Sequence, residues 1–337
     1  MITGRNTVAR RLFVAFAVTA ALVTAACGSS DSNNKGVNAD GSVDLSQVTL
    51  RIGDQKGQAL QALLEVSGQG KDLPYKLDWS TFTAGPPILE AINAGSVDLG
   101  GVGNAPPVFA AAAKSQIKIV AAYSTGVQGQ AIVVPKDSTL KDPKDLRGKK
   151  IAVTQGSSGH QHLLAVLAKN GMTFADIQPQ YLQPADALAA LSTGRVDAWA
   201  VWDPYVAQAE KAGDRVLVNG EGYLRGDAFF VAGTKALANK ASSAALRDLL
   251  TRIQRAQAWI VANPEAWAKQ SADITGVPYD VTLVAVKRAL YQHHPLDAPT
   301  IAEEQSVADA FTDAKLIPGK VNITDFVDTR FNDRFNS

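Results

Sequence analysis

Cysteine is almost missing from this chain of 337 residues, since Cys27 is the only one. A single cysteine excludes an internal disulfide and a metal cluster built on cysteine ligands. A long apolar run is also missing, because the stretch from Leu12 to Ala26 falls short of the about 20 residues that a membrane-spanning helix needs. Basic charge is not in excess, since 33 Lys and Arg stand against 32 Asp and Glu. Nucleic acid, which requires clustered basic residues, is therefore not an expected partner.

Sequence signatures of catalysis and metal binding are absent too. No P-loop occurs, so the chain does not itself hydrolyse nucleotide. No G-x-S-x-G elbow surrounds Ser157, Ser158 and His160. His293 and His294 are expected on a helix, where neighbours in sequence do not face each other, and no carboxylate or cysteine cluster has ligand spacing. The sequence therefore predicts no enzyme, no metal site and no cofactor.

The N-terminus has the order of a secretory signal peptide, with charge first, an apolar region next and small residues last. Three arginines precede the apolar stretch, and two alanines precede Cys27. Residues 23–27 resemble a bacterial lipobox, although Thr24 stands where leucine is usual. We therefore expect residues 1–26 to be cleaved and the thiol of Cys27 to carry a lipid.

The segment after the cysteine predicts a tether, residues 27–47. Its stretch from Gly28 to Asp44 consists mainly of Gly, Ser, Asn and Asp, a composition that buries little apolar surface and stays flexible. Removal of residues 1–26 takes away three arginines and no acids, which leaves 30 basic and 32 acidic residues. We expect the mature chain to be slightly acidic and held by its lipid at the outer face of the cytoplasmic membrane.

A short pattern occurs twice, at residues 89–106 and at residues 188–205. Each copy runs from an apolar helix end through Gly, Val and Asp into a short buried strand and a proline turn, and its acid is Asp98 in the first copy and Asp197 in the second. Ligands favour clefts between domains and the carboxyl ends of strands. Two lobes of one plan with a binding cleft between them explain the repeat most simply.

Strands and helices alternate along the body of the chain, which predicts an α/β fold with mainly parallel sheets flanked by helices. Two such series are separated by a charged segment with two flanking or internal prolines, residues 136–149. We expect lobe one to comprise residues 48–134 and 229–337, and lobe two to comprise residues 135–228.

Three strand-to-helix turns have the composition of an anion site. They span residues 83–87, 103–107 and 155–160 and combine glycine with proline or serine. Glycine allows close approach, proline suits a first helical turn, and serine hydroxyls donate hydrogen bonds. A helix start adds unpaired amides and a partial positive charge. Capping alone explains any single turn, but three turns on two similar lobes favour anion binding.

The second copy of the repeat ends in bulky residues, whereas the first ends in small ones. Trp199 and Trp202 are three positions apart on a strand, so they face opposite sides. At most one lines the cleft, and we expect Trp199 to do so and to contact an organic tail. Asp203 precedes a proline and suits a helix cap as well as a cleft position.

The motifs of the mature chain, taken in order, resemble those of one known family. They are Arg51–Gly57, Ala84–Pro86, Leu89–Pro107, Gly156–His160, Tyr181 with Pro184–Asp186, and Val196–Tyr205. The family is that of the aliphatic-sulfonate substrate-binding proteins of ABC importers, within a sulfonate, nitrate and taurine group. The resemblance covers the chain from Val48 to its C-terminus and implies a two-lobed, type II periplasmic-binding fold that closes on a sulfonate.

The resemblance also implies a set of ligand-binding residues, in which helix-start amides and hydroxyls meet the sulfonate oxygens. The set is Gln55, Gly85, Pro86, Asn104, Ser157, Ser158, His160, Trp199 and Asp203. Two positions depart from the family pattern. Relatives usually have an aromatic residue in place of Asp54 and an acid in place of Asn104. Asp54 is expected to repel an anion if it faces the cleft, whereas the loss of an acid at position 104 favours one.

The function implied is that of a monomeric binding protein that captures a small anionic sulfonate for sulfur uptake. Its partners are a membrane permease and a separate ATPase, and its only contact with the membrane is the lipid anchor. Taurine, nitrate and a thiamine or pyrimidine precursor are alternative solutes. An enzyme of thiamine-precursor or menaquinone chemistry on the same fold is the alternative of another class.

Overall fold

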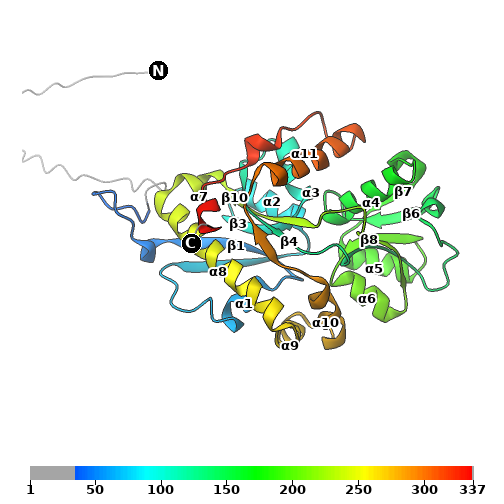
Figure 1. The fold of residues 1–337 in the computed structure, drawn as a ribbon, viewed down its shortest axis with the longest axis horizontal. Coiled ribbons are helices and arrows are strands. Elements are labelled where there is room, and N and C mark those ends of the chain that lie inside the picture. The colour runs from blue at the N-terminus through cyan, green and yellow to red at the C-terminus, as the bar shows by residue number, and fades with distance from the viewer. Residues whose placement is uncertain (1–34, 336–337) are drawn as a thin grey trace, which may run out of the picture. The chain divides into compact units, whose positions relative to one another are not determined.

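The computed structural model describes residues 35–335. The expected signal peptide, residues 1–26, and Cys27 lie outside this range. Within it, the chain forms two β-sheets that helices flank (Figure 1). None of the described helices is long and apolar enough to cross a membrane.

Part of the expected tether is folded. Val37 and Val43 form an antiparallel bridge, and both pack with Leu45 against the core of lobe one. The prediction of a flexible tether over residues 27–47 is therefore wrong for residues 35–47. A few apolar side chains in a mostly polar stretch are sufficient to attach it.

Lobe one contains a six-stranded sheet. Its strands are β1 (Thr49–Gln55), β2 (Lys76–Phe82), β3 (Leu99–Gly103), β4 (Ile117–Ser124), β10 (Asp227–Gly233) and β11 (Gln292–His294). They follow the order β11-β4-β10-β3-β1-β2. β1 is parallel to β2 and β3, whereas β10 is antiparallel to β3 and β4.

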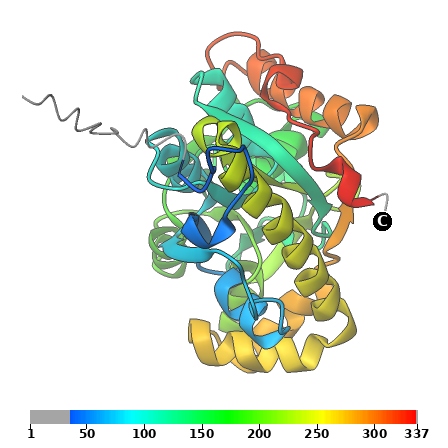
Figure 2. The same ribbon diagram turned by 90° about the vertical axis from the view of Figure 1, so that its left-hand side faces the viewer.

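Helices cover both faces of this sheet (Figure 2). They are α1 (Leu60–Val66), α2 (Gly85–Asn93), α3 (Ala105–Ala112), α7 (Thr234–Ala238), α8 (Lys240–Ala262), α9 (Pro264–Thr275), α10 (Tyr279–Arg288) and α11 (Ala298–Asp313). Side chains alternate along each strand, so Phe230 joins the cluster with α1 and α8, whereas Phe229 joins the cluster with α2, α3 and α11. The sheet is therefore buried on both sides.

Lobe two contains a five-stranded sheet in the order β7-β6-β8-β5-β9. Its strands are β5 (Gln130–Val134), β6 (Lys150–Val153), β7 (Gln178–Tyr181), β8 (Ala198–Trp202) and β9 (Arg215–Asn219), and its helices are α4 (Ser158–Lys169), α5 (Pro184–Ser192) and α6 (Tyr205–Ala212). β6 is parallel to β7 and β8, and β5 is antiparallel to β8 and β9. The predicted two-lobed α/β fold is confirmed.

The chain crosses between the lobes earlier than expected. Because β5 pairs with β8 and β9, it belongs to the second sheet, and the boundary predicted at Val134 is wrong. The crossing segments are residues 125–129 and 220–226. They lie side by side, since the amide of Thr125 donates to the carbonyl of Gly226 at 2.8 Å. The apolar sequence of β5 is compatible with either sheet, so only its pairing with β8 and β9 determines to which sheet it belongs.

The two copies of the sequence repeat occupy equivalent places, one in each sheet. In lobe one the Asp98 carboxylate accepts a hydrogen bond from the amide of Arg51 at 2.8 Å. In lobe two the Asp197 carboxylate accepts one from the amide of Lys150, also at 2.8 Å. Each acid thus ties the repeat to the start of the neighbouring parallel strand, which explains why the Val-Asp pair occurs in both copies.

The adjacent histidines lie on a strand rather than on the expected helix. β11 pairs antiparallel with β4. His293 stacks on Tyr123 with ring centroids 5.4 Å apart, and His294 Nε2 lies 3.3 Å from Asp227 Oδ1. The helix prediction is wrong here because a three-residue strand is determined by its partner strand and has no periodic pattern of its own.

Candidate functional site

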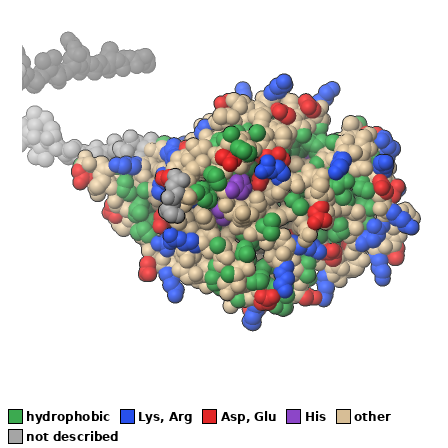
Figure 3. Space-filling view, in the orientation of Figure 1, with side chains coloured by type: hydrophobic (Ala, Val, Ile, Leu, Met, Phe, Trp, Pro, Cys, Tyr) green, Lys and Arg blue, Asp and Glu red, His purple; other side chains and the backbone are tan. Residues whose placement is uncertain are grey.

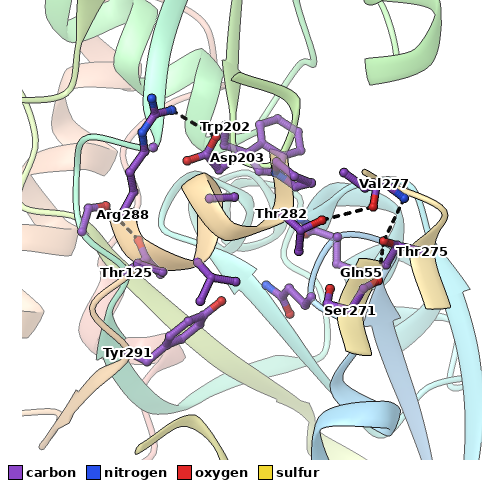
Figure 4. Close-up of a pocket in the computed structure, with 18 of the residues that line it drawn as sticks. Gln55, Thr125, Trp202, Asp203, Ser271, Thr275, Val277, Thr282, Arg288 and Tyr291 are labelled. Carbon is purple, nitrogen blue, oxygen red and sulfur yellow. Dashed lines mark hydrogen bonds and ion pairs between the residues drawn. The ribbon is translucent and has the colours of Figure 1, made fainter. Parts of the chain in front are cut away.

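Two adjoining cavities lie between the lobes, at the strand ends. The inner cavity has a volume of about 70 Å³, and the outer cavity, shown in Figure 4, has a volume of about 130 Å³. The two cavities adjoin, because four side chains line both: Gln55, Gln58, Gln130 and Trp202. The inner cavity is completed by Gly85, Gly103, Pro106, Ser157 and Ser158.

Three helices begin at the inner cavity. α2 starts at Gly85, α4 starts at Ser158, and α3 starts two residues after Gly103. The first amides of a helix have no partner within it and carry partial positive charge. Among the described residues, no Lys or Arg lines this cavity. An anion held there would therefore be bound by helix starts, which bind small anions without a basic side chain.

The two serines of the α4 turn have different roles. Ser157 is buried and caps the helix: its hydroxyl donates to the carbonyl of Thr154 at 2.7 Å and accepts from the amide of His160 at 3.2 Å. The hydroxyl of Ser158 accepts from Gln130 Nε2 at 3.1 Å. A hydroxyl that accepts one hydrogen bond still has its proton to donate. Ser158 is therefore the donor available to a ligand.

Glycine brings the two lobes close together beside both cavities. A Cβ at Gly103 in lobe one would lie 2.9 Å from the Cβ of Ser158 in lobe two. A Cβ at Gly57 would lie 2.8 Å from Cδ of Pro204. Real Cβ atoms do not approach so closely, so only glycine permits this packing.

Only some of the predicted ligand-binding residues line a cavity. Those that line the inner cavity are Gln55, Gly85, Ser157 and Ser158. Asp203 lines the outer cavity. Those that line neither cavity are Pro86, Asn104, His160 and Trp199. Pro86 and Asn104 each follow a lining glycine by one residue but do not line a cavity themselves. The structure therefore does not support a direct contact of either residue with a ligand.

Trp202, not Trp199, faces the cleft. Trp199 is fully buried against the core that α5 and α6 cover, whereas Trp202 ends β8 and lines both cavities. Of the two tryptophans of β8, only Trp202 lines a cavity, so the choice of Trp199 is wrong. Both tryptophans pack in the core cluster with α5 and α6, but Trp199 lies within the strand and is enclosed there, whereas Trp202 ends the strand and reaches beyond it.

His160 packs between the lobes instead of lining a cavity. Its ring lies among Phe109 and Phe311 of lobe one and Phe174 and Tyr181 of lobe two. Burial lowers the pKa of His160 to about 4. The ring is therefore neutral near pH 7 and contributes packing, not charge, to the contact between the lobes.

Asp54 points away from both cavities, because neighbours on a strand face opposite sides and Gln55 faces inward. Its Oδ2 accepts a hydrogen bond from the amide of Gln61 at 3.3 Å. Asp54 is 7% exposed, and burial raises its pKa to about 6. Asp54 therefore does not face the cleft, and the repulsion of an anion that its carboxylate would cause there is not expected.

Asp54→Asn is expected to raise the free energy of unfolding at pH 8 and to change it little at pH 4. A carboxyl whose pKa is raised on folding contributes stability at low pH that is lost as the pH rises through about 6. The amide avoids that loss, which by linkage amounts to at most about 3 kcal/mol. Urea denaturation at the two pH values measures the difference. Asp137→Asn, at an exposed carboxylate, is the control, and an equal effect of Asp54→Asn at both pH values would refute the assignment.

Several lining residues were not predicted. In the inner cavity they are Gln58, Gly103, Pro106, Gln130 and Trp202. A signal existed for Gln130, since it is the polar residue that opens an apolar strand, and for Gly103, which lies in a predicted turn. The outer cavity also takes residues from α9, including Trp267. It takes others from α10 and the segment after it, where Figure 4 shows Arg288 and Tyr291. No local motif marks these residues.

Charge outside the cleft is mixed. On the face shown in Figure 3, Lys and Arg are interspersed with Asp and Glu and do not form one basic patch. Cross-lobe ion pairs such as Lys211 with Asp280 join α6 to α10. Both side chains of this pair are more than half exposed, so it contributes little to stability.

The sequence and the fold both match known proteins. Residues 84–267 match the NMT1/THI5-like family. A protein of Escherichia coli (strain K12) named as an aliphatic sulfonates-binding protein is 38% identical over 289 residues, which are 82% of this chain and 88% of the relative. The taurine-binding periplasmic protein of the same organism is 33% identical over 61% of this chain and 64% of its own length.

Solved structures of similar proteins share the fold. The alkanesulfonate-binding protein SsuA from Xanthomonas axonopodis pv. citri, bound to MOPS, is 36% identical with a TM-score of 0.78, over 83% of this chain and 97% of that one. The periplasmic aliphatic sulphonate binding protein SsuA from Escherichia coli is 35% identical with a TM-score of 0.74, over 82% and 91%. The desulfurization enzyme DSZB, 14% identical with a TM-score of 0.61, shares the fold alone. The chain therefore belongs to the NMT1/THI5-like family, together with these aliphatic sulfonate-binding proteins.

Proposed function

We propose that this chain is the solute-binding component of an ABC importer and that its solute is an organic sulfonate. The inner cavity carries the proposal, because three helix starts and the hydroxyl of Ser158 converge there without a basic side chain. Such a site suits a compact, singly charged oxyanion. The relatives named for sulfonate binding, which match most of the chain, support the same solute class.

The outer cavity supports a solute with an organic tail. It adjoins the inner cavity at Trp202 and has a volume of about 130 Å³. A sulfonate head in the inner cavity would place its tail there, whereas nitrate or sulfate would leave this space unfilled. An apolar wall such as Trp202 contributes to binding by removing apolar surface of the tail from water.

The proposed mechanism is capture and delivery. The lobes open and close about the two crossing segments, residues 125–129 and 220–226, and the closed form docks on a permease that a separate ATPase drives. The signal-peptide order and the lipobox support an export route and a lipid at Cys27, at the outer face of the cytoplasmic membrane. Cys27→Ser should release the full chain from the membrane fraction, and unchanged retention would refute the anchor.

A calorimetric titration tests the solute. The panel contains alkanesulfonates of increasing length, taurine, nitrate, sulfate and a thiamine precursor. Stoichiometric binding of a sulfonate without turnover supports the proposal. Binding of no sulfonate below about 1 mM, where association is worth only about 4 kcal/mol, overturns it. Conversion of any compound by the protein supports the enzyme alternative instead.

Ser158→Ala is expected to weaken sulfonate binding roughly tenfold, because a hydrogen bond to a charged group is worth about 1.5 kcal/mol or more. Ser157→Ala is the matched control from the neighbouring position. It removes a helix cap and is expected to lower stability by about 1 kcal/mol while affinity changes less. Titration calorimetry and urea denaturation of both variants separate the two roles. Equal losses of affinity would contradict them.

A further inference from the structure

The outer cavity has a charged wall that the head site does not use. Among the described residues that line it, only Asp203 and Arg288 are charged. They come from opposite lobes, since Asp203 follows β8 and Arg288 ends α10 (Figure 4). Asp203 Oδ1 and Arg288 Nη1 are 3.5 Å apart. A tail that enters the cavity therefore meets this pair.

Arg288 is shared between two acids. Its Nη2 lies 2.6 Å from Glu210 Oε2, closer than its Nη1 lies to Asp203. Two carboxylates thus share one guanidinium, so the side chains of Asp203, Glu210 and Arg288 together carry a net negative charge. Of the two acids, Asp203 is the more buried, with a side chain 13% exposed against 34% for Glu210. The uncompensated charge therefore lies mainly at the cavity wall.

One oxygen of Asp203 is without a donor. Its Oδ1 accepts from the amide of Ala207 at 3.1 Å, whereas its Oδ2 is buried and has no hydrogen-bond partner among the described residues. Burial raises the pKa of Asp203 to about 6, so the carboxyl is ionised near pH 7.5. An ionised, buried oxygen without a donor is unfavourable. A donor brought by a ligand would remove that cost.

The backbone at Gly129 approaches this oxygen closely, which only glycine permits. Gly129 also lines the outer cavity, and a Cβ there would lie 2.7 Å from Asp203 Oδ2. Gln130 and Trp202, the neighbours of these two residues in sequence, line both cavities. A solute whose head occupies the inner cavity therefore extends along Trp202 toward Asp203.

We propose that Asp203 selects the tail of the solute by accepting a hydrogen bond from a protonated amine, so that the cleft prefers aminoalkanesulfonates to plain alkanesulfonates of equal length. This inference rests on the proposed function. The excess negative charge of the Asp203, Arg288 and Glu210 group favours a cation over a neutral donor. A hydroxyl on the tail supplies the donor without the charge and is expected to give an intermediate affinity.

Calorimetric titration of the full chain at pH 7.5 tests the inference with solutes that differ only at the tail end. The probes are propane-1-sulfonate, 3-hydroxypropane-1-sulfonate and 3-aminopropane-1-sulfonate, with the corresponding two- and four-carbon compounds. We expect the amine of the best-fitting length to bind at least about tenfold more tightly than its alkane counterpart, as a charge-assisted hydrogen bond implies. Equal affinities of amine and alkane at every length would overturn the inference while the proposed function stands. Binding of no sulfonate at all would overturn both.

The Asp203→Asn variant tests whether Asp203 causes the preference for an amine on the tail. Asparagine keeps an oxygen for the amide of Ala207 and removes the charge, so folding is retained and thermal unfolding checks this. We expect the ratio of amine to alkane affinity to fall to within about threefold of one, the loss of the charge-assisted bond. Asp54→Asn is the matched control, since Asp54 is a buried acid with a similarly raised pKa that lines neither cavity. A ratio unchanged in Asp203→Asn, or lowered equally in the control, would refute the role of Asp203.

Discussion

Gly103→Val is expected to abolish sulfonate binding while both lobes remain folded. The position ends β3, and a Cβ there would lie 2.9 Å from the Cβ of Ser158 across the cleft. A valine therefore keeps the lobes apart and also fills the head site. We expect the affinity to fall more than about 100-fold, which corresponds to about 2.7 kcal/mol. Titration calorimetry measures the loss, and thermal unfolding verifies that the variant is folded.

Two further variants delimit this effect. Gly103→Ala adds one carbon and is expected to give an intermediate loss, because Ser158 shifts less to accommodate it. Asn104→Ala, one residue later, changes a side chain that lines neither cavity and is expected to leave affinity within about threefold of the wild type. Binding by Gly103→Val at wild-type strength would show that the lobes do not close at this point.

The lobe plan could be predicted because its signals are local and occur twice. Gly, Val and Asp recur before β3 and β8, and in each copy the acid accepts a hydrogen bond from an amide in the first part of the neighbouring strand. The head site could be predicted for the same reason. Gly85, Ser157 and Ser158 lie in strand-to-helix turns, where residue type reports directly on capping and on free amides.

The outer cavity could not be predicted in this way. Arg288 and Tyr291 belong to the C-terminal helical region and reach the cleft only through the packing of α10 against α6 and the crossing segment. The amide of Leu290, for example, donates to the carbonyl of Thr125 at 3.2 Å. Contacts between residues so far apart in sequence leave no periodic or local pattern.

Pairing between strands limited the prediction in two other places. β5 is an apolar strand that either sheet would bury, and only its antiparallel pairing with β8 and β9 assigns it to lobe two. Among the strands that the structure describes, the three residues of β11 pair with β4 alone. Alternation along β8 predicted that Trp199 and Trp202 face opposite sides, but both pack in one core cluster and against Tyr205. Only Trp202, at the end of the strand, also reaches the cavities.

Trp202→Ala is expected to weaken the binding of long-tailed sulfonates about 100-fold and that of methanesulfonate much less. The indole forms a wall common to both cavities, and each buried methylene of a tail is worth about 0.8 kcal/mol. The loss should therefore grow with tail length until the tail passes beyond the indole. Titration of a homologous series of alkanesulfonates measures this dependence.

Trp199→Ala is the control that distinguishes a loss of core packing from a loss of contact with the solute. Trp199 is fully buried beside Tyr205, with ring centroids 6.0 Å apart, so truncation is expected to cost about 3–5 kcal/mol of stability through the cavity that it leaves. The affinity of the folded protein for each sulfonate should nevertheless stay near that of the wild type, without a dependence on tail length. A length-dependent loss in Trp199→Ala but not in Trp202→Ala would reverse the assignment of the two side chains. The same strand would then present its other side to the ligand.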